Sequence, residues 1–473
     1  MSAQTEGAQK PKSTNPTSAE RVTAFAVIVF TMITIGCAAG NFSQTAMNAM
    51  LGDVRIDFGV DVDTSQLLST VYMLVMGITV PVVTYVAKRF SLRTVLNIAW
   101  AFLALGAFID FVTSNFWVFL FGRILQAIST GMVMPVGMAF AMLNFPPNRQ
   151  GTAMGLSGMA VGFAPNVGPL IGGAFSEGIG WRYFFIVVVV IAAVLCIVTC
   201  VYCKRESNKK DAGHLDGISV VLSTLGFGGI LLGCSNASSH ELTSPTIWVS
   251  LAVGVIALVL FVVRQKSSKT PLINLAIFKS YRFKNGFILQ NALTGSFMGV
   301  LLILPIFVTN LWGGTAVDSG LVFIPTAFAA GIFNPLAGIL SDKIGPRKIM
   351  LCAGIFLLFG SCSMVFIDET TPLWLIATLQ GIRAMGISSC MSPMFQWTLS
   401  DTPREIVMDG SSFSNTVRQS FSSIIAAIQV FLIVVFGGME GIDPAFGYHL
   451  AFGLSALLSI TTFLIVVTKV RTD

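Results

Sequence analysis

Three arginines lie well inside long apolar segments of the sequence: Arg123, Arg383 and Arg418. A charged side chain in such a segment is costly, so it usually faces a cavity or a partner and carries function. No acid lies clearly at the middle of any apolar segment, and the nearest is Asp110, about one turn from the end of its segment. If all three arginines face inward, they form a positive cavity without a buried counter-charge. Such a cavity favours carboxylate or phosphate groups.

Uncharged polar side chains recur along the same segments and would line the rest of this cavity. Together with the three arginines, the candidates for contact with a small-molecule substrate are Asn41, Ser43, Gln44, Asn48, Gln126, Asn166, Gln290, Asn291, Asn334, Gln396 and Asn415. The 38 Phe residues could supply apolar walls. A mostly apolar cavity with a few polar groups is typical of small-molecule sites.

The sequence gives no sign of covalent chemistry. Its three histidines, His214, His240 and His449, are dispersed, and it has neither an HExxH zinc motif nor a buried pair of acids. The nucleotide-binding motif GxxxxGK[ST] is also absent. We therefore predict that the protein is not an enzyme and uses no cofactor, metal, nucleotide or nucleic acid.

The elements that position these residues are predicted to be membrane helices. The chain of 473 residues is 54% hydrophobic and 11% charged, whereas soluble domains have about 25% charged residues. A spanning helix needs about 20 apolar residues. We predict an all-α membrane protein with 14 transmembrane helices, at roughly 22–50, 66–87, 94–113, 116–143, 151–175, 182–203, 215–235, 246–264, 284–310, 318–340, 347–367, 373–399, 410–436 and 446–468.

Basic residues predict the orientation of the helices. If the N-terminal tail is cytoplasmic, cytoplasmic loops hold almost all of the loop Lys and Arg, and outside loops keep only Arg55 and Arg182. This asymmetry follows the positive-inside rule, so both termini are expected in the cytoplasm. Because no organelle-targeting feature is present, we expect a multi-pass protein of the plasma membrane.

An internal repeat at an offset of 254 divides the chain. Gly77 and Pro81 match Gly331 and Pro335, and Leu125-Gln126 matches Leu379-Gln380. Repeated halves with a site between them are typical of transporters. The predicted parts are a disordered cytoplasmic tail at 1–21, a six-helix bundle at 22–203, two inserted helices with cytoplasmic linkers at 204–283, a second six-helix bundle at 284–468, and a cytoplasmic tail at 469–473.

Three segments carry recognisable motifs. Residues 338–348 read GILSDKIGPRK, residues 122–126 read GRILQ, and residues 151–173 place glycines at four-residue spacing before a GPLIGG run. They resemble, respectively, the gating-loop, buried-arginine and antiporter motifs of the major facilitator superfamily, in particular of its fourteen-helix drug:proton antiporter branch. Residues 415–419, NTVRQ, are also typical of that branch.

This resemblance implies the major facilitator fold, alternating access and multidrug efflux by a monomer. On this basis the predicted gating residues are Gly162, Gly168, Pro169, Gly172, Gly173, Gly338, Asp342, Gly345, Arg347 and Lys348. Asp342 can cap the N-terminus of a neighbouring helix. The glycines allow close approach of helix backbones, and Gly168-Pro169 can bend its helix.

The sequence departs from this family pattern at two positions. Ser43 stands where the branch carries an acid, and a serine cannot bind and release a proton at neutral pH. Proton coupling is therefore predicted to use Asp110 with Arg123, or a carboxylate at a cavity mouth, although Asp110 could also be a solvated acid near the membrane surface. Lys88 stands where the family has an acid, which puts the conformational lock of that half in question.

These observations favour a secondary exporter of amphipathic, drug-like molecules that exchanges them for protons. An exporter or facilitator of organic anions or zwitterions, with weak or no proton coupling, remains open because of the arginines and Ser43. A non-transporting membrane sensor or enzyme fits less well, because no soluble domain or catalytic motif is visible. The expected partners are the substrate, protons and the lipid bilayer.

Overall fold

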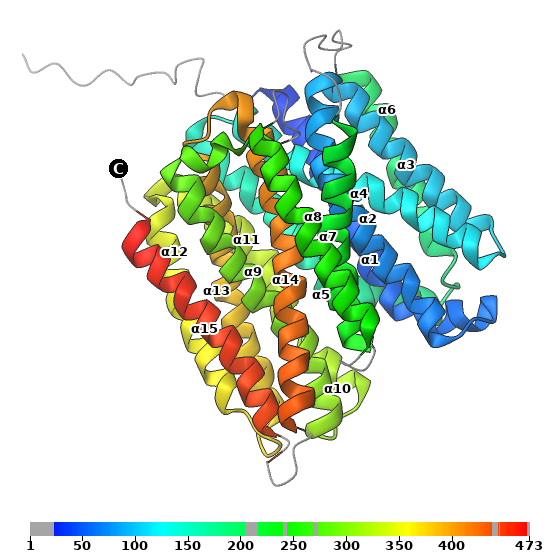
Figure 1. Cartoon of the computed structure of the whole chain (residues 1–473), viewed down its shortest axis with the longest axis vertical. Helices are drawn as coiled ribbons and strands as arrows, with labels where there is room; N and C mark the ends of the chain where they lie inside the picture. The colour runs from blue at the N-terminus through cyan, green and yellow to red at the C-terminus, as the bar shows by residue number, and fades with distance from the viewer. Residues whose placement is uncertain are drawn as a thin grey trace, which may run out of the picture.

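The computed structural model describes residues 23–203, 216–239, 244–267, 273–437, 443 and 445–470. Every regular element in these ranges is helical, which confirms the all-α prediction (Figure 1). The predicted tail at 1–21 and the linker residues 204–215 lie outside the described residues.

The long helices follow the predicted ranges. They are α1 (Ala24–Phe58), α2 (Val62–Arg89), α3 (Leu92–Val112), α4 (Phe116–Asn144), α5 (Gln150–Glu177), α6 (Tyr183–Tyr202), α7 (Gly217–Ser239), α8 (Pro245–Ser267), α9 (Tyr281–Ile306), α11 (Ile324–Ile344), α12 (Pro346–Ser363), α13 (Leu373–Leu399), α14 (Val407–Gly437) and α15 (Ala445–Lys469). A short α10 (Ala316–Leu321) precedes α11, where the sequence predicted one continuous helix.

By length and composition, ten helices of the described residues could cross a membrane, or up to twelve if two bent pairs each count as one span. The helix α13 carries Arg383 and several amides and hydroxyls, which lower its hydropathy. Fourteen crossings therefore stay a prediction, although the number of long helices is consistent with it.

Local sequence explains where several helices begin, end and bend. The Thr23 hydroxyl caps α1 by accepting a hydrogen bond from the Ala26 amide, and Gly59 ends it with a left-handed φ of 64°. The helix α5 bends by 48° between Ala164 and Asn166. Proline has no backbone N–H and so cannot donate the hydrogen bond that a helix needs at its position. The bend thus falls at Pro165, one turn before the Gly168-Pro169 pair that the sequence suggested.

The helices form two groups that touch through a limited set of elements. Within α1–α6 and within α9–α15 the helices pack closely, and the groups meet where α5 contacts α11 and α13 and where α14 contacts α2 and α4. In Figure 1 the groups lie together at the upper end, and their lower ends lie farther apart. We call the end at which Lys88 pairs with Asp409, and Asp342 binds the Gly151 amide, the closed end.

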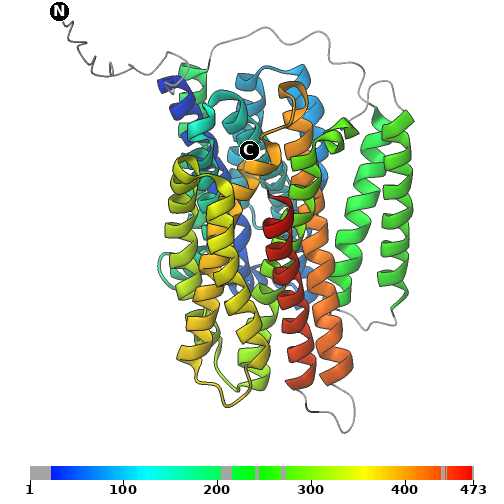
Figure 2. The same cartoon turned by 90° about the vertical axis from the view of Figure 1, so that its left-hand side faces the viewer.

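The remaining two long helices, α7 and α8, stand on one flank. They pack against each other, and α7 also contacts α2 and α14. Figure 2 shows this pair beside α14 at the edge of the molecule.

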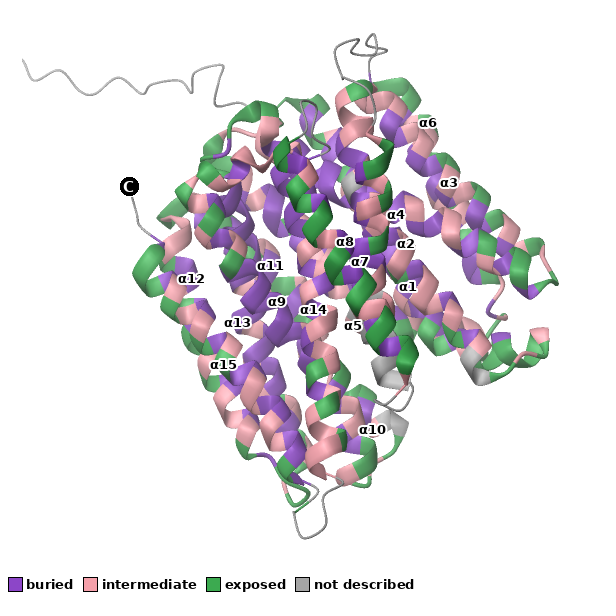
Figure 3. Cartoon of the chain, viewed as in Figure 1, coloured by how far each residue is buried: buried purple, intermediate pink, exposed green. Residues whose placement is uncertain are grey.

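Buried residues lie along the inner faces of the helices and exposed residues along the outer faces (Figure 3), and many large hydrophobic side chains are among the exposed ones. On α6, for example, Val187, Val190, Val194 and Ile197 form one exposed stripe at helical spacing. A contiguous apolar surface of this kind requires a non-aqueous environment, which agrees with a lipid-facing exterior.

Candidate functional site

A buried polar network surrounds Arg123 on α4. Its Nη1 donates to the Ser43 hydroxyl at 2.8 Å and to Gln126 Oε1 at 3.0 Å, and its Nη2 donates to the Ser43 carbonyl at 3.1 Å. The guanidinium also lies over the Tyr72 ring, with Cζ at 4.4 Å from the ring centroid. Arg123 is thus held by α1, α2 and α4 together, which fixes a charge that would otherwise be costly in this environment.

Asp110 on α3 belongs to the same network. Its side chain is fully buried, and Gln126 Nε2 donates to its Oδ2 at 2.6 Å. Its other oxygen, Oδ1, has no hydrogen-bond partner among the described residues. Gly122 makes room for this carboxylate, because a Cβ there would lie 2.0 Å from Oδ1.

Two expectations are corrected by this geometry. Asp110 is not a solvated acid near the surface, and Arg123 does not lack a buried counter-charge, because Gln126 joins their side chains. Buried charges are tolerated when paired and hydrogen-bonded. Ser43, which stands in place of an acid, donates to Gln126 Oε1 at 2.5 Å and completes the contact between α1, α3 and α4.

Sequence reasoning missed two members of this network, Tyr72 and Thr130. The Tyr72 hydroxyl lies 2.7 Å from the Thr130 hydroxyl and donates to the Gly40 carbonyl at 2.9 Å. Both residues lie within predicted apolar helices, where a buried hydroxyl needs a partner. That requirement was the available signal for them.

Arg383 on α13 has a different environment. Its Nε donates to the Ser361 hydroxyl at 3.3 Å, its Nη1 donates to Gln380 Oε1 at 3.3 Å, and its Nη2 donates to the Ser296 carbonyl. The Ser459 hydroxyl bridges Ser296 and Ser361 at 2.9 and 2.8 Å. Among the described residues no carboxylate pairs with Arg383, so serines that the sequence analysis did not single out satisfy this guanidinium.

Arg418 on α14 lies at the interface between the two groups. Its Nη2 donates to Asn415 Oδ1 at 3.2 Å and contacts Met134 Sδ on α4 at 3.8 Å. Its Nε has no partner in the described part of the chain. Of the three predicted arginines, Arg418 is therefore the one that faces the other group with an N–H available.

Two predicted amides meet at a small cavity between α5, α9, α11 and α13. Asn166 Nδ2 donates to the Gly162 carbonyl at 2.8 Å, and Asn334 Nδ2 donates to the Ala330 carbonyl at 3.0 Å. These bonds fix the amide orientation and leave both Oδ1 atoms without a partner in the described residues. The cavity has a volume of about 10 Å³, which admits about one water molecule.

The other predicted substrate contacts are placed along the inner helices and do not converge on one pocket. Asn41, Gln44 and Asn48 lie on α1, and the Asn48 oxygen accepts from Ser69 at 2.6 Å. On α9, Gln290 is fully buried with neither amide atom paired within the described ranges, and Asn291 donates to the Phe287 carbonyl at 2.7 Å. Asn415 donates to the Ser411 carbonyl at 2.9 Å.

The closed end is built around Asp342 on α11. Its carboxylate accepts from the Gly151 and Thr152 amides at 2.7 Å each and from the Thr152 hydroxyl at 2.6 Å, so it caps the start of α5 as the motif indicated. Gln396, a predicted substrate contact, instead lies here, with Nε2 at 3.3 Å from Asp342 Oδ1. Gly345 has a φ of 88°, which ends α11 before the exposed Lys348.

Glycines on α5 bring it against two different helices. Gly151, Gly155, Gly158 and Gly162 face α11, whereas Gly168 and Gly172 face Thr45 and Ala46 on α1. Gly173 has open space around it. The bend at Pro165 separates these two contact regions.

We expect Gly338→Ala to destabilise the closed end. A Cβ at this position would lie 2.2 Å from the Gly151 carbonyl oxygen, so α5 and α11 must separate. Such overpacking costs about 1–3 kcal/mol, which unfolding measurements in detergent would detect together with loss of transport. Gly173→Ala is the matched control, because no neighbouring atom lies within 4 Å of its added Cβ. Equal stability of the two variants would contradict the close contact.

The closed end has a second contact between the two groups, which corresponds to the contact of Asp342 with α5. The sequence put this conformational lock in question, but it is present, with a base where the family has an acid and an acid on the partner helix. Lys88 on α2 forms an ion pair with Asp409 on α14 at 2.8 Å. Lys88 occupies the repeat position of Asp342, and Asp409 directly precedes the Gly410-Ser411 pair that matches Gly151-Thr152. The acid has thus moved to the other side of the contact, and the two groups remain joined.

Comparisons with known proteins agree with this arrangement. Residues 26–427 match the family model described as Major Facilitator Superfamily. Relatives include a Bacillus subtilis protein named uncharacterized MFS-type transporter YcnB, 30% identical over 93% of this chain and 94% of that protein. Another is the lincomycin resistance protein LmrB of B. subtilis, 33% identical over 83% and 82% of the two chains.

More distant similarity extends to the multidrug export protein EmrB of Escherichia coli, 22% identical over 83% of this chain and 78% of that protein. Among solved structures, the human organic anion transporter MFSD10 aligns over 93% of this chain and 99% of its own, with a TM-score of 0.60 and 11% identity. At that identity the likeness concerns the fold.

Proposed function

The chain belongs to the Major Facilitator Superfamily, and on this premise we propose that it is a secondary exporter of amphipathic, drug-like molecules that works by proton-coupled alternating access. Family membership and the transporter names of its relatives indicate a membrane transporter rather than an enzyme. The relatives named for lincomycin resistance and multidrug export support a drug-like substrate.

The observation that carries proton coupling is the chain of contacts from Asp110 through Gln126 to Ser43 and Arg123. When Asp110 is ionised, Gln126 Nε2 donates to its carboxylate. The other end of the amide, Gln126 Oε1, then points toward Arg123 and Ser43 and accepts from both. A proton on Asp110 removes the negative charge that balances Arg123, so the preferred arrangement of these side chains changes. Because they come from α1, α3 and α4, protonation alters the packing of the first group of helices.

Alternating access explains why the candidate substrate contacts surround so little space. Asn166 and Asn334 lie on helices of different groups, so their cavity enlarges only when α5 and α11 separate. The closed end carries Lys88, Lys343 and Arg347, so by the positive-inside rule we assign it to the cytoplasmic side. We place both termini in the cytoplasm and the protein, as a monomer, in the plasma membrane.

One observation favours the second candidate function, export of organic anions or zwitterions with weak or no proton coupling. Arg418 lies between the groups with its Nε unpaired in the described residues, and a guanidinium N–H is a good partner for a carboxylate or phosphate. In that case the proton network would be structural.

Purified protein in liposomes that contain a pH-sensitive dye tests both functions. A proton gradient is imposed, and cationic, zwitterionic and anionic compounds are added in turn. We expect substrate-dependent proton movement with cationic or neutral amphipathic compounds. Proton movement triggered only by anions would favour the second substrate class, and substrate flux without any proton movement would refute antiport.

A further inference from the structure

One oxygen atom joins three parts of the molecule at the closed end. Asp409 Oδ1 accepts from Lys88 Nζ at 2.8 Å and from the Asn274 backbone amide at 2.9 Å. The Asp409 side chain is fully buried, whereas Lys88 is about one-third exposed. Asn274 belongs to the connection between α8 and α9, so this carboxylate links α2, α14 and the segment that follows the inserted pair.

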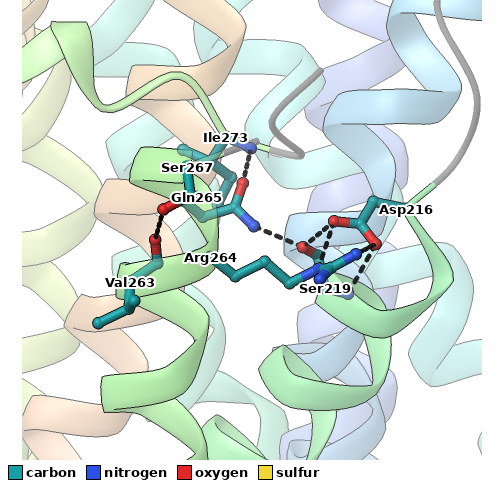
Figure 4. A network of polar contacts seen from close by, with 7 residues as sticks. All are labelled: Asp216, Ser219, Val263, Arg264, Gln265, Ser267 and Ile273. Atoms are coloured by element: carbon teal, nitrogen blue, oxygen red, sulfur yellow. Dashed lines mark hydrogen bonds and ion pairs between the residues drawn. The ribbon is translucent and has the colours of Figure 1, made fainter. Parts of the chain in front are cut away.

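The inserted pair holds this connection by its own polar contacts (Figure 4). Gln265 on α8 accepts from the Ile273 amide at 3.1 Å, and its Nε2 donates to the Ser219 hydroxyl on α7 at 2.7 Å. Arg264 Nε and Nη2 donate to the two oxygens of Asp216 at 2.8 Å each. This contact lowers the pKa of the Asp216 carboxyl, so the pair stays ionised at neutral pH.

Apolar packing fixes residues 273–279 of this connection. Ile273 and Ile277 are fully buried and form one cluster with Phe261 on α8, Phe283 on α9 and Phe413 on α14. Asn274 begins a 3-10 turn, Leu275–Lys279, by accepting a hydrogen bond from the Ala276 amide at 3.0 Å. A displacement of α7 and α8 would therefore move the Asn274 amide.

The two locks of the closed end differ in what they require. Asp342 accepts from backbone amides and a hydroxyl at the start of α5 and from Gln396 Nε2, so both of its oxygens have partners. Asp409 is more deeply buried and its second oxygen, Oδ2, has no partner among the described residues, so Oδ1 must be oriented toward Lys88. The Asn274 amide lies at the position that fixes this orientation.

We propose that the inserted helices α7 and α8 brace the closed end: through Gln265, Ile273 and Asn274 they orient the Asp409 carboxylate toward Lys88. The pair thereby stabilises the conformation in which the two groups touch at this end. Gln265 and Asn274 are positioning residues that act through Asp409. This inference rests on the closed end opening during transport, and it requires neither proton coupling nor a particular substrate.

Hydrogen–deuterium exchange of the full chain in lipid nanodiscs tests the proposal without substrate or proton gradient. Gln265→Met removes the acceptor of the Ile273 amide, and Lys88→Met removes the ion pair directly. We expect both variants to raise amide exchange in residues 85–93 and 404–412 by about 3- to 10-fold.

Ser267→Ala is the matched control on α8, because the Ser267 hydroxyl donates to the Val263 carbonyl in the same helix. Faster exchange confined to α7, α8 and residues 273–279 in Gln265→Met, with residues 85–93 and 404–412 unchanged, would overturn the proposal. Should this variant fail to fold, Arg264→Gln applies the same test, because Arg264 is partly exposed and its loss breaks the Asp216 contact. Failure of the liposome assay would leave these exchange results unaffected.

Discussion

Asp110→Asn is expected to abolish accumulation of substrate against its gradient. For one proton per substrate, one unit of pH difference supports about a tenfold concentration ratio, since one unit corresponds to about 1.4 kcal/mol. Asparagine has the shape of aspartate and still offers an oxygen to Gln126 Nε2, so the fold should persist. It cannot bind and release the proton, and the ratio should fall to about one.

The measurement compares substrate uptake into everted vesicles with and without a proton gradient. Asp53→Asn provides a control, because Asp53 is an exposed acid on α1 far along the helix from Ser43. Retained gradient-driven accumulation in Asp110→Asn, at the wild-type ratio, would remove Asp110 from the coupling mechanism. In that event a carboxylate at the mouth of the cavity would be the next candidate.

Arg123→Met is expected to lower the free energy of unfolding by about 3 kcal/mol or more, because it leaves Asp110 buried without a counter-charge. The double variant Asp110→Asn with Arg123→Met should recover part of this loss, since both charges are then gone. Coupled residues of one network show non-additivity of about 0.5–3 kcal/mol. Unfolding in detergent, followed by circular dichroism, measures all four members of the cycle.

Arg383→Met supplies the contrast for this cycle. Its guanidinium contacts serines and Gln380, and no described carboxylate pairs with it. Its effect should therefore add to that of Asp110→Asn without an interaction energy. If the changes in the free energy of unfolding caused by Asp110→Asn and Arg123→Met were also strictly additive, the two charges would not be coupled through Gln126.

The sequence was sufficient to predict the features that depend on position along a helix. Apolar length located the long helices, and the GILSDKIGPRK motif located a carboxylate that does cap the start of another helix. The cap could be foreseen because an acid on a short turn near a helix N-terminus is favoured by the helix dipole. The division into two bundles and an inserted pair follows the same reasoning and remains a proposal.

Contacts between distant helices could not be predicted in the same way. Because Asp110 lies near the end of its segment, it could be expected to contact solvent. In the structure it lies on the face of α3 that meets Gly122 on α4, where the missing side chain leaves room for the carboxylate, and it is buried. Lys88 looked like a lost lock, because its partner, Asp409, is 321 residues away on another helix. The serines around Arg383 are of a residue type that is common in membrane helices, so their spacing in the sequence did not distinguish them from other serines.

The glycine face of α5 has a thermodynamic consequence for reversibility. An interface made of leucine and phenylalanine side chains would expose a large apolar area on opening, at about 25 cal/mol for each Å². Where α5 meets α11, backbone lies against backbone at Gly151, Gly155 and Gly338. Separation there wets mainly peptide groups, which water solvates well. At this contact α5 and α11 can therefore touch closely and still part at a small cost in free energy.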